Sequence, residues 1–189
     1  MHTFLMGFWL LFFLSTFVWR SSINFKRHGV NPLVLPSDDS TYGYVGNTFK
    51  LLVLWILGWL VYGFFQPVQS GPLAALGLLV MLSGWLLVLV SQRDLGKSWR
   101  IGIDQHTPTD LIQHGIYQRS RNPIFLGMRL ALLGFWLCQP HLAVLLAVVL
   151  GEVLMQIQVR LEEEHLLKLH GQTYQAYTSG TPRWWKLLP

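Results

Sequence analysis

The sequence predicts an all-α membrane protein with about five transmembrane helices, and three observations carry this prediction. Of the 189 residues, 52% are hydrophobic and 12% are charged, and the mean hydropathy is +0.39. The chain holds 9 Trp and 11 Phe, which is more apolar surface than one small core can bury. The charged residues are absent from long stretches of the chain. A bilayer takes up apolar surface that a soluble fold cannot hide, so the chain belongs in a membrane.

The first predicted span covers 1–19, a stretch without charge. Arg20, Lys26 and Arg27 follow it, which is the reverse of the basic start of a signal peptide, and no small-residue cleavage site is present. We therefore expect an uncleaved helix with its N-terminus outside.

Two further spans are expected in the uncharged stretch 51–92, which is too long for one helix. Pro and Gly residues at 66–72 predict a turn between a helix from about Asn47 and a helix from about Pro72. Asn47 or Thr48 is the expected cap of the first of these helices, and Pro72 suits a first helical turn. Close helix packing is expected at three glycines, which are Gly58, Gly77 and Gly84.

These three helices make up a predicted N-terminal region, 1–92, in which the turn-rich segment 21–48 is a connector. The remaining region, 93–189, contains a predicted transmembrane hairpin at 123–159, broken by Pro140 and its neighbours. Nearly all Lys and Arg lie at 21–48, 93–122 and 160–189. The positive-inside rule places those segments, and the C-terminus, in the cytosol.

Composition also limits the partners and cofactors that the sequence predicts. The single cysteine, Cys138, excludes an internal disulfide and a cysteine-based zinc site, and no histidine pattern predicts a metal. The pI of 9.6 needs no nucleic acid to explain it, because basic loops beside anionic membrane lipid suffice. The sequence leaves the oligomeric state open.

Polar residues cluster at the cytosolic ends of the predicted hairpin. Asn122-Pro123 is a helix-start signal, and Arg121 beside it suits an anionic group. On the second arm, Glu152, Gln156, Arg160, Glu163 and Leu167 fall on one helical stripe. A polar stripe that continues from a membrane span predicts a polar cavity.

Five short motifs in 94–185 appear in the order of a known family. They are Gly115-Ile116-Tyr117, Arg121-Asn122-Pro123-Ile124-Phe125-Leu126-Gly127, Glu162-Glu163-Glu164-His165-Leu166, Gly171-Gln172-Thr173-Tyr174-Gln175-Ala176-Tyr177 and Thr181-Pro182-Arg183. In these the chain resembles the integral-membrane methyltransferases related to isoprenylcysteine carboxyl methyltransferase and to phospholipid methyltransferases. Two residues depart from the family pattern: Asn122 replaces a His and Phe125 replaces a Tyr.

The resemblance implies S-adenosylmethionine as the methyl donor, bound at the cytosolic membrane face, with the acceptor arriving from the lipid. It implies cofactor contacts from Ile112, Gly115, Ile116, Tyr117, Arg121, Asn122, Pro123, Phe125, Gly127, Glu162, Glu163 and Tyr174. It implies catalytic roles for Arg121, Arg160 and Glu163, with Arg121 on the donor's carboxylate and Glu163 serving the donor or the acceptor. Gln158, two residues before Arg160, is expected to point away from the helical face of Arg160. An apolar or lipid-borne small acceptor is expected, and its nucleophile is a carboxylate, an amine or a thiol.

Arg129 and Glu152 are the charges deep within the predicted hairpin. Both lie about 11.5 residues, or roughly 17 Å, from a turn centred between Pro140 and His141, and hence at equal depth. A lone charge there costs about 2.5–3.5 kcal/mol, so we expect the two to pair. With Gln156 they either hold the hairpin together or form the floor of the acceptor pocket.

Two other classes of function remain open at this stage. One is a non-enzymatic membrane scaffold whose polar residues only satisfy one another. The other is a membrane reductase that binds NADPH with the same C-terminal hairpin. Binding of S-adenosylhomocysteine or of NADPH distinguishes the three.

Overall fold

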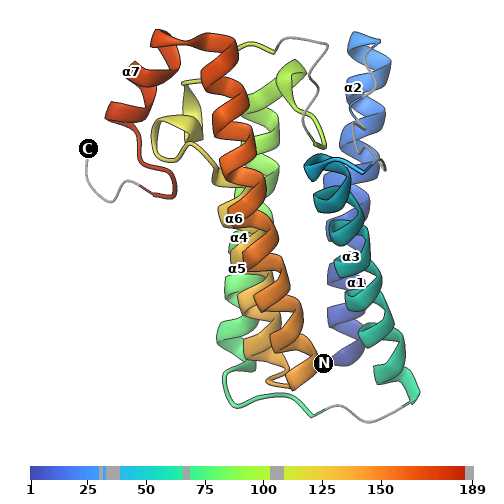
Figure 1. The fold of residues 1–189 in the computed structure, drawn as a ribbon. Coiled ribbons are helices and arrows are strands. Elements are labelled where there is room, and N and C mark those ends of the chain that lie inside the picture. Colours follow the sequence, from blue (N-terminus) through green and yellow to red (C-terminus); the bar gives the residue numbers. More distant parts are fainter. Residues whose placement is uncertain (30–31, 33–38, 66–68, 103–108, 186–189) are drawn as a thin grey trace.

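A computed structural model describes residues 1–29, 32, 39–65, 69–102 and 109–185 of the chain. Its long helices form two groups (Figure 1): α1 (His2–Phe13) and α3 (Thr41–Phe65) lie together, and α4 (Ala74–Leu95), α5 (Pro123–Cys138) and α6 (Leu142–His170) form the second group. The N-terminus lies at the same end as the turn between α5 and α6, whereas α2 (Arg20–His28) and α7 (Gln172–Gly180) lie at the opposite end.

The prediction of a helical membrane protein with about five spans is confirmed. Four helices are long and apolar enough to cross a membrane, and α5 is a shorter apolar helix. The described residues contain no strand; Ile101 alone among them has an isolated bridge assignment, and its N–H donates to the Pro32 carbonyl at 2.8 Å. The α6 helix has 29 residues, about 43 Å at 1.5 Å per residue, and exceeds a hydrocarbon core of about 30 Å. Its apolar run ends at Val159, so 160–170 extends beyond the membrane-spanning part.

The first two helices are longer than the sequence predicted. The first continues through a π-helical segment, η1 (Leu14–Trp19), and through α2, and it ends at Gly29, where φ is +66°. The α3 helix begins at Thr41 rather than near Asn47, because Ser40 Oγ accepts from the Gly43 N–H at 3.1 Å and caps it. Helix therefore occupies much of the expected connector, in which 30–31 and 33–38 lie outside the described residues.

The α4 and α5 helices pack through glycines that face each other in two pairs. A Cβ added at Gly84 would lie 2.5 Å from the Gly127 carbonyl oxygen, and one at Gly134 would lie 2.5 Å from that of Gly77. Only residues without a Cβ allow the two backbones this approach. Of the three glycines predicted at close contacts, Gly77 and Gly84 are confirmed, whereas Gly58 has nothing within 4 Å of an added Cβ.

The predicted pair of Arg129 and Glu152 is present between α5 and α6. Arg129 Nε lies 2.7 Å from Glu152 Oε2, and a second guanidinium nitrogen lies 2.9 Å from Oε1. Gln156 extends the pair by donating to Glu152 Oε1 at 2.8 Å. Trp184 stacks on the guanidinium of Arg129, whose central carbon lies 4.2 Å from the ring centroid. The C-terminal segment therefore reaches the pair from outside the hairpin.

Candidate active site

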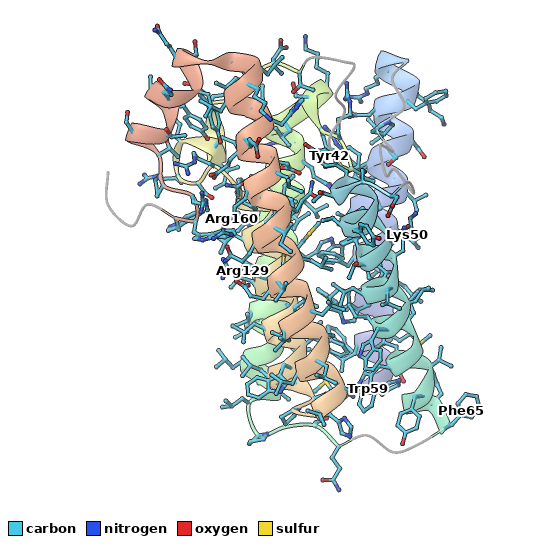
Figure 2. The ribbon with its side chains drawn as sticks, viewed as in Figure 1. Tyr42, Lys50, Trp59, Phe65, Arg129 and Arg160 are labelled. Atoms are coloured by element: carbon cyan, nitrogen blue, oxygen red, sulfur yellow. The ribbon has the colours of Figure 1, made fainter. Side chains whose placement is uncertain are left out.

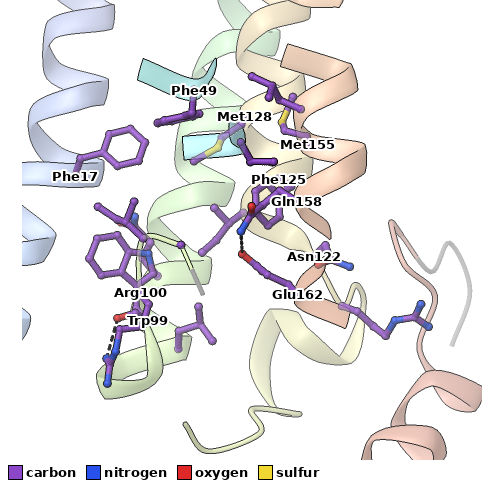
Figure 3. Close-up of a pocket in the computed structure, with 18 of the residues that line it drawn as sticks. Phe17, Phe49, Trp99, Arg100, Asn122, Phe125, Met128, Met155, Gln158 and Glu162 are labelled. Carbon is purple, nitrogen blue, oxygen red and sulfur yellow. Dashed lines mark hydrogen bonds between the residues drawn. The ribbon is translucent and has the colours of Figure 1, made fainter. Parts of the chain in front are cut away.

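A cavity of about 260 Å³ lies between the two helix groups. The first helix and α3 form one wall, α5 and α6 form the other, and described residues of the loops after α4 line the end opposite the N-terminus. Figure 3 shows Phe17 and Phe49 on the first wall, with Phe125, Met128 and Met155 across from them. Most of the lining is apolar, and the polar side chains gather at the end opposite the N-terminus, the polar end of the cavity.

The loop after α4 is held in place by the extension of the first helix. Asn24, 2% exposed, donates from Nδ2 to the carbonyls of Trp99 at 3.1 Å and Gly96 at 3.4 Å. Arg20 donates to the same Gly96 carbonyl at 2.8 Å. These side chains fix the 98–102 part of the cavity wall, a role that no pattern in the sequence indicates.

The turn at Gly115 is fixed by an aspartate that the sequence did not single out. Asp94 Oδ2 accepts from the Ile116 N–H at 2.9 Å. Gly115 has φ +60°, and a Cβ on it would lie 2.1 Å from that carboxylate oxygen. Glycine is therefore required there for both backbone conformation and space. The turn η3 (Gly115–Gln118) then presents Tyr117 to the cavity.

Glu163 lies at the centre of an ionic cluster outside the cavity lining. Arg183 donates to its Oε2 at 2.6 Å and Arg121 to its Oε1 at 3.0 Å, and Asn122 donates to Oε1 at 2.9 Å. Burial opposes ionisation, but the hydrogen bonds from Arg183 and Arg121 outweigh it and hold the pKa of Glu163 below its ordinary value. This carboxylate is ionised and fully engaged near neutral pH.

Arg121 is occupied by the protein rather than free for a ligand. Besides Glu163, it donates to the carbonyls of Thr181 at 2.8 Å and Thr178 at 3.2 Å. The Arg121 N–H also donates to the Pro182 carbonyl at 3.1 Å. The expected contact between Arg121 and the donor's carboxylate stays a prediction, and the geometry assigns Arg121 the role of holding the C-terminal segment against α5.

Asn122 occupies the cap position of α5 without capping it. Its side chain is directed to Glu163, and no side-chain cap bond forms. Its own N–H donates to Ser120 Oγ at 3.1 Å. The start of α5 at Pro123 is confirmed, and the reason is the proline and the surrounding cluster rather than an asparagine cap.

Glu162 differs from its neighbour because it lines the cavity. Gln158 Nε2 donates to its Oε1 at 2.9 Å, a bond drawn in Figure 3. Burial raises the pKa of Glu162 to about 7, Gln158 opposes the rise, and the charge of Glu163 adds to it. A carboxyl group with a pKa near 7 can both accept and donate a proton at neutral pH.

Tyrosines from α7 and η3 complete the polar end. Tyr177 donates its hydroxyl to the Tyr117 carbonyl at 2.6 Å and so ties α7 to the turn. Burial raises the pKa of Tyr117 and of Tyr174, and that of Tyr177 to about 12, so all three stay neutral at physiological pH. The buried hydroxyl of Tyr174 has no hydrogen-bond partner within the described part of the chain. A polar ligand in the cavity could satisfy it.

The structure brings part of the predicted site together. The predicted residues that line the cavity are Ile112, Tyr117, Arg121, Asn122, Phe125, Glu162 and Tyr174. The others lie behind the lining: Gly115, Ile116, Pro123 and Glu163 support it, and Gly127 packs against α4.

The predicted acceptor floor lies outside this cavity. Arg129, Glu152, Gln156 and Arg160 are absent from its lining, and Figure 2 shows Arg129 and Arg160 on the side of the hairpin that faces away from α3. The α6 stripe of Glu152, Gln156 and Arg160 is not the one that faces the cavity, which carries Gln158 and Glu162 instead. Gln158 points away from the face of Arg160, as expected, but its own face, which it shares with Glu162 at 100° per residue, is the one that lines the cavity.

Comparison with known proteins agrees with this architecture. The model of the phospholipid methyltransferase family matches residues 73–173, just over half of the chain. A methanethiol S-methyltransferase of Crocosphaera subtropica is 26% identical over 172 residues, which cover 84% of this chain and 64% of that protein. The chain thus spans less than two thirds of the length of this relative. With its apolar helices and the family match across α4, α5 and α6, the chain belongs to the phospholipid methyltransferase family of integral-membrane proteins.

Proposed function

We propose that the protein transfers a methyl group from S-adenosylmethionine to a small apolar or lipid-borne acceptor at the cytosolic face of the membrane. The observation that carries this proposal is the continuity of the cavity. One end of it is polar and holds an ionisable carboxyl group, and the rest of it is an apolar chamber between membrane-spanning helices. One site therefore suits a polar cofactor and an apolar acceptor together.

The cofactor belongs at the polar end, against Ile112, Tyr117, Asn122, Glu162 and Tyr174. S-adenosylmethionine supplies an electrophilic methyl group on a sulfonium sulfur. The unpartnered Tyr174 hydroxyl provides a hydrogen bond for a polar ligand, and the Glu162 carboxylate suits the positive charge of a sulfonium or an ammonium.

The acceptor belongs in the apolar chamber, where Phe17, Phe49, Met128 and Met155 surround it. In-line methyl transfer requires the nucleophile about 3 Å from the methyl carbon, in a site that excludes water. The aromatic and thioether side chains exclude water without competing for the methyl acceptor's polar atoms. The Crocosphaera relative is named for a small thiol acceptor, which supports a thiol among the carboxylate, amine and thiol alternatives.

Ligand binding tests the proposed function directly. Purified protein in detergent is titrated calorimetrically with S-adenosylhomocysteine and with NADPH. We expect binding of S-adenosylhomocysteine alone. Binding of NADPH alone would support a reductase instead, and binding of neither would support a scaffold.

Variants of the ionic cluster give the corresponding site test. Glu163→Gln and Arg121→Ala should each weaken S-adenosylhomocysteine binding at least tenfold, because the loss of either partner loosens the wall that carries Asn122 and Tyr174. Arg160→Ala is the matched control, since Arg160 does not line the cavity and its hydrogen bonds within the described residues go to Gln156. Wild-type affinity in both cluster variants would contradict this site.

The proposed orientation has the N-terminus outside and the C-terminus in the cytosol. Cysteines introduced at the exposed Ser70 and Ser179 lie at opposite ends of the helices. In intact cells an impermeant maleimide should label Ser70→Cys and leave Ser179→Cys unlabelled until the membrane is opened. The reverse pattern would overturn the orientation.

A further inference from the structure

Adjacent carboxylates on α6 have different environments. Glu163 accepts hydrogen bonds from two arginines and one asparagine, and its side chain is 12% exposed. Glu162 lines the cavity and receives a hydrogen bond from Gln158. Because neighbouring helical residues point about 100° apart, only one of the two can face the chamber. Glu162 is therefore the carboxylate that a bound ligand meets.

The cationic groups at the same end are already used by the protein. Arg121 donates to Glu163 and to two backbone carbonyls. Arg100 donates from one terminal nitrogen to the carbonyls of Lys97 at 2.7 Å and Trp99 at 3.1 Å, and its buried Nε has no partner within the described residues. A carboxylate acceptor would have to give up its hydration beside Glu162, whose negative charge repels it, which is unfavourable.

A thiol meets none of these obstacles. It is neutral and weakly polar, so its transfer into a chamber of phenylalanine and methionine costs little. It carries a proton that must leave, and a carboxylate that lines the chamber can take this proton as the sulfur attacks. An ammonium acceptor, in contrast, must give up the hydration of a full positive charge before it can enter the chamber.

Resting on the proposed function, we propose that Glu162 is the general base of the transfer and that the acceptor is a thiol with an apolar body. The sulfur lone pair of the acceptor forms a bond to the methyl carbon. The bond from this carbon to the sulfonium sulfur breaks, and its electron pair stays on that sulfur. The thiol proton passes to Glu162, which gives neutral S-adenosylhomocysteine and a methyl thioether.

Other titratable groups near Glu162 have separate roles. Glu163 is ion-paired, and the tyrosines Tyr117, Tyr174 and Tyr177 stay neutral because burial raises their pKa values. His165 lies one turn further along α6 and also lines the cavity, so it is the alternative base. Asp110 lines the same cavity but pairs with Lys97 at 2.8 Å.

The test compares three acceptors of equal chain length: octanethiol, octylamine and octanoate. Purified protein in nanodiscs is supplied with radiolabelled S-adenosylmethionine, and the variants are Glu162→Gln and His165→Gln. Glu164→Gln is the matched control, because Glu164 is exposed and pairs with Lys168 on the helix surface. Calorimetric binding of S-adenosylhomocysteine to every variant shows whether the cofactor site is intact.

We expect wild-type protein to methylate octanethiol preferentially, with kcat rising with pH through about 7. Glu162→Gln should lower kcat by 10²–10⁴-fold and remove that pH dependence, with S-adenosylhomocysteine affinity within threefold of wild type. His165→Gln and Glu164→Gln should keep the profile. Wild-type turnover in Glu162→Gln, loss of the profile in His165→Gln instead, or preference for another acceptor would overturn the inference while the proposed function stands. Failure of wild-type protein to bind S-adenosylhomocysteine would overturn the proposed function itself.

Discussion

The α5 helix has two packed sides that differ in kind. Against α4 it makes backbone contacts at the Gly77–Gly134 and Gly84–Gly127 pairs, where an added methyl group would meet main-chain atoms. Toward the first helix and α3 its side chains line a cavity instead. Two backbones in direct contact cannot shift to accommodate added volume, whereas aromatic and methionine side chains can repack around a bound ligand. The comparison indicates a rigid half that fixes the site and an adaptable half that receives the ligand.

The most direct test of this difference is to add one methyl group to the interface between α4 and α5. Gly84→Ala should lower the free energy of unfolding by about 1–3 kcal/mol, because the helices must separate or strain. The matched control is Gly58→Ala on α3, where an added Cβ meets nothing within 4 Å. That change should be neutral or stabilising by up to about 1 kcal/mol, from helix propensity. Thermal unfolding in detergent measures both, and equal losses would refute the contrast.

The coupling free energy between Arg129 and Glu152 should be similar to, or smaller than, the loss of stability expected for Gly84→Ala. Arg129→Met leaves a carboxylate and Glu152→Leu leaves a guanidinium at a depth where an unpaired charge is unfavourable. The side chains are 28% and 38% exposed, and we expect a coupling free energy of about 0.5–3 kcal/mol, as for other residues in direct contact. In a double-mutant cycle, the double variant should be more stable than the worse single variant. Strictly additive losses would contradict the pairing.

Raising the pH should destabilise the wild type through Glu162. Its pKa in the folded protein, about 7, lies above that of an unfolded carboxyl group. Between the ordinary pKa of 4.5 and about 7, the folded state holds a proton that the unfolded state has lost, so stability falls as pH rises across this range and levels off above it. Glu162→Gln cannot ionise, so its unfolding midpoint should change less between pH 5 and pH 7.5. Parallel curves for the two proteins would show that Glu162 is not perturbed.

On the side of α5 that faces the cavity, truncating a lining side chain should have the smallest effect on the free energy of unfolding and a larger effect on the choice of methyl acceptor. Phe49 packs edge-on against Phe17 at 5.7 Å and otherwise borders the cavity, so Phe49→Ala removes fewer contacts than a change in a filled core. We expect a loss below about 1 kcal/mol, compared with about 3–5 kcal/mol for Phe135→Ala, whose side chain is 1% exposed. Phe49→Ala should also shift the preferred acceptor toward longer chains. Equal stability losses would show that the chamber is packed like the core.

The parts of this molecule that the sequence predicted are those set by local pattern and by chain geometry. The uncharged stretches located the spans, and the distances of Arg129 and Glu152 from the turn predicted their pairing. Which α6 stripe faces the chamber depends on how the first helix and α3 pack against the hairpin. A single residue step changes the direction by about 100°. The polar stripe containing Glu163 was therefore assigned to the cavity, although the stripe of Glu162 and Gln158 occupies it.

Hydrogen bonds between residues far apart in the sequence were not predicted, for the same reason. Asn24 and Asp94 act on backbone atoms that are 75 and 22 residues away, respectively. No periodicity or motif marks such contacts, because a single asparagine or aspartate near a helix end is ordinary in sequence. The helix extensions into 21–48 were missed because the polar residues there resemble a connector. Many of them are exposed, whereas Asn24 is buried.

Cys138, finally, makes this protein convenient for chemical assays of thiol consumption. Its sulfur is 0% exposed, and it lies 3.4 Å from the Ala74 carbonyl oxygen, to which it donates. The folded protein therefore offers no accessible sulfhydryl to a disulfide reagent such as dithionitrobenzoate. Colour developed in a reaction mixture would report the remaining substrate alone, and a stoichiometric burst from the protein would itself signal unfolding.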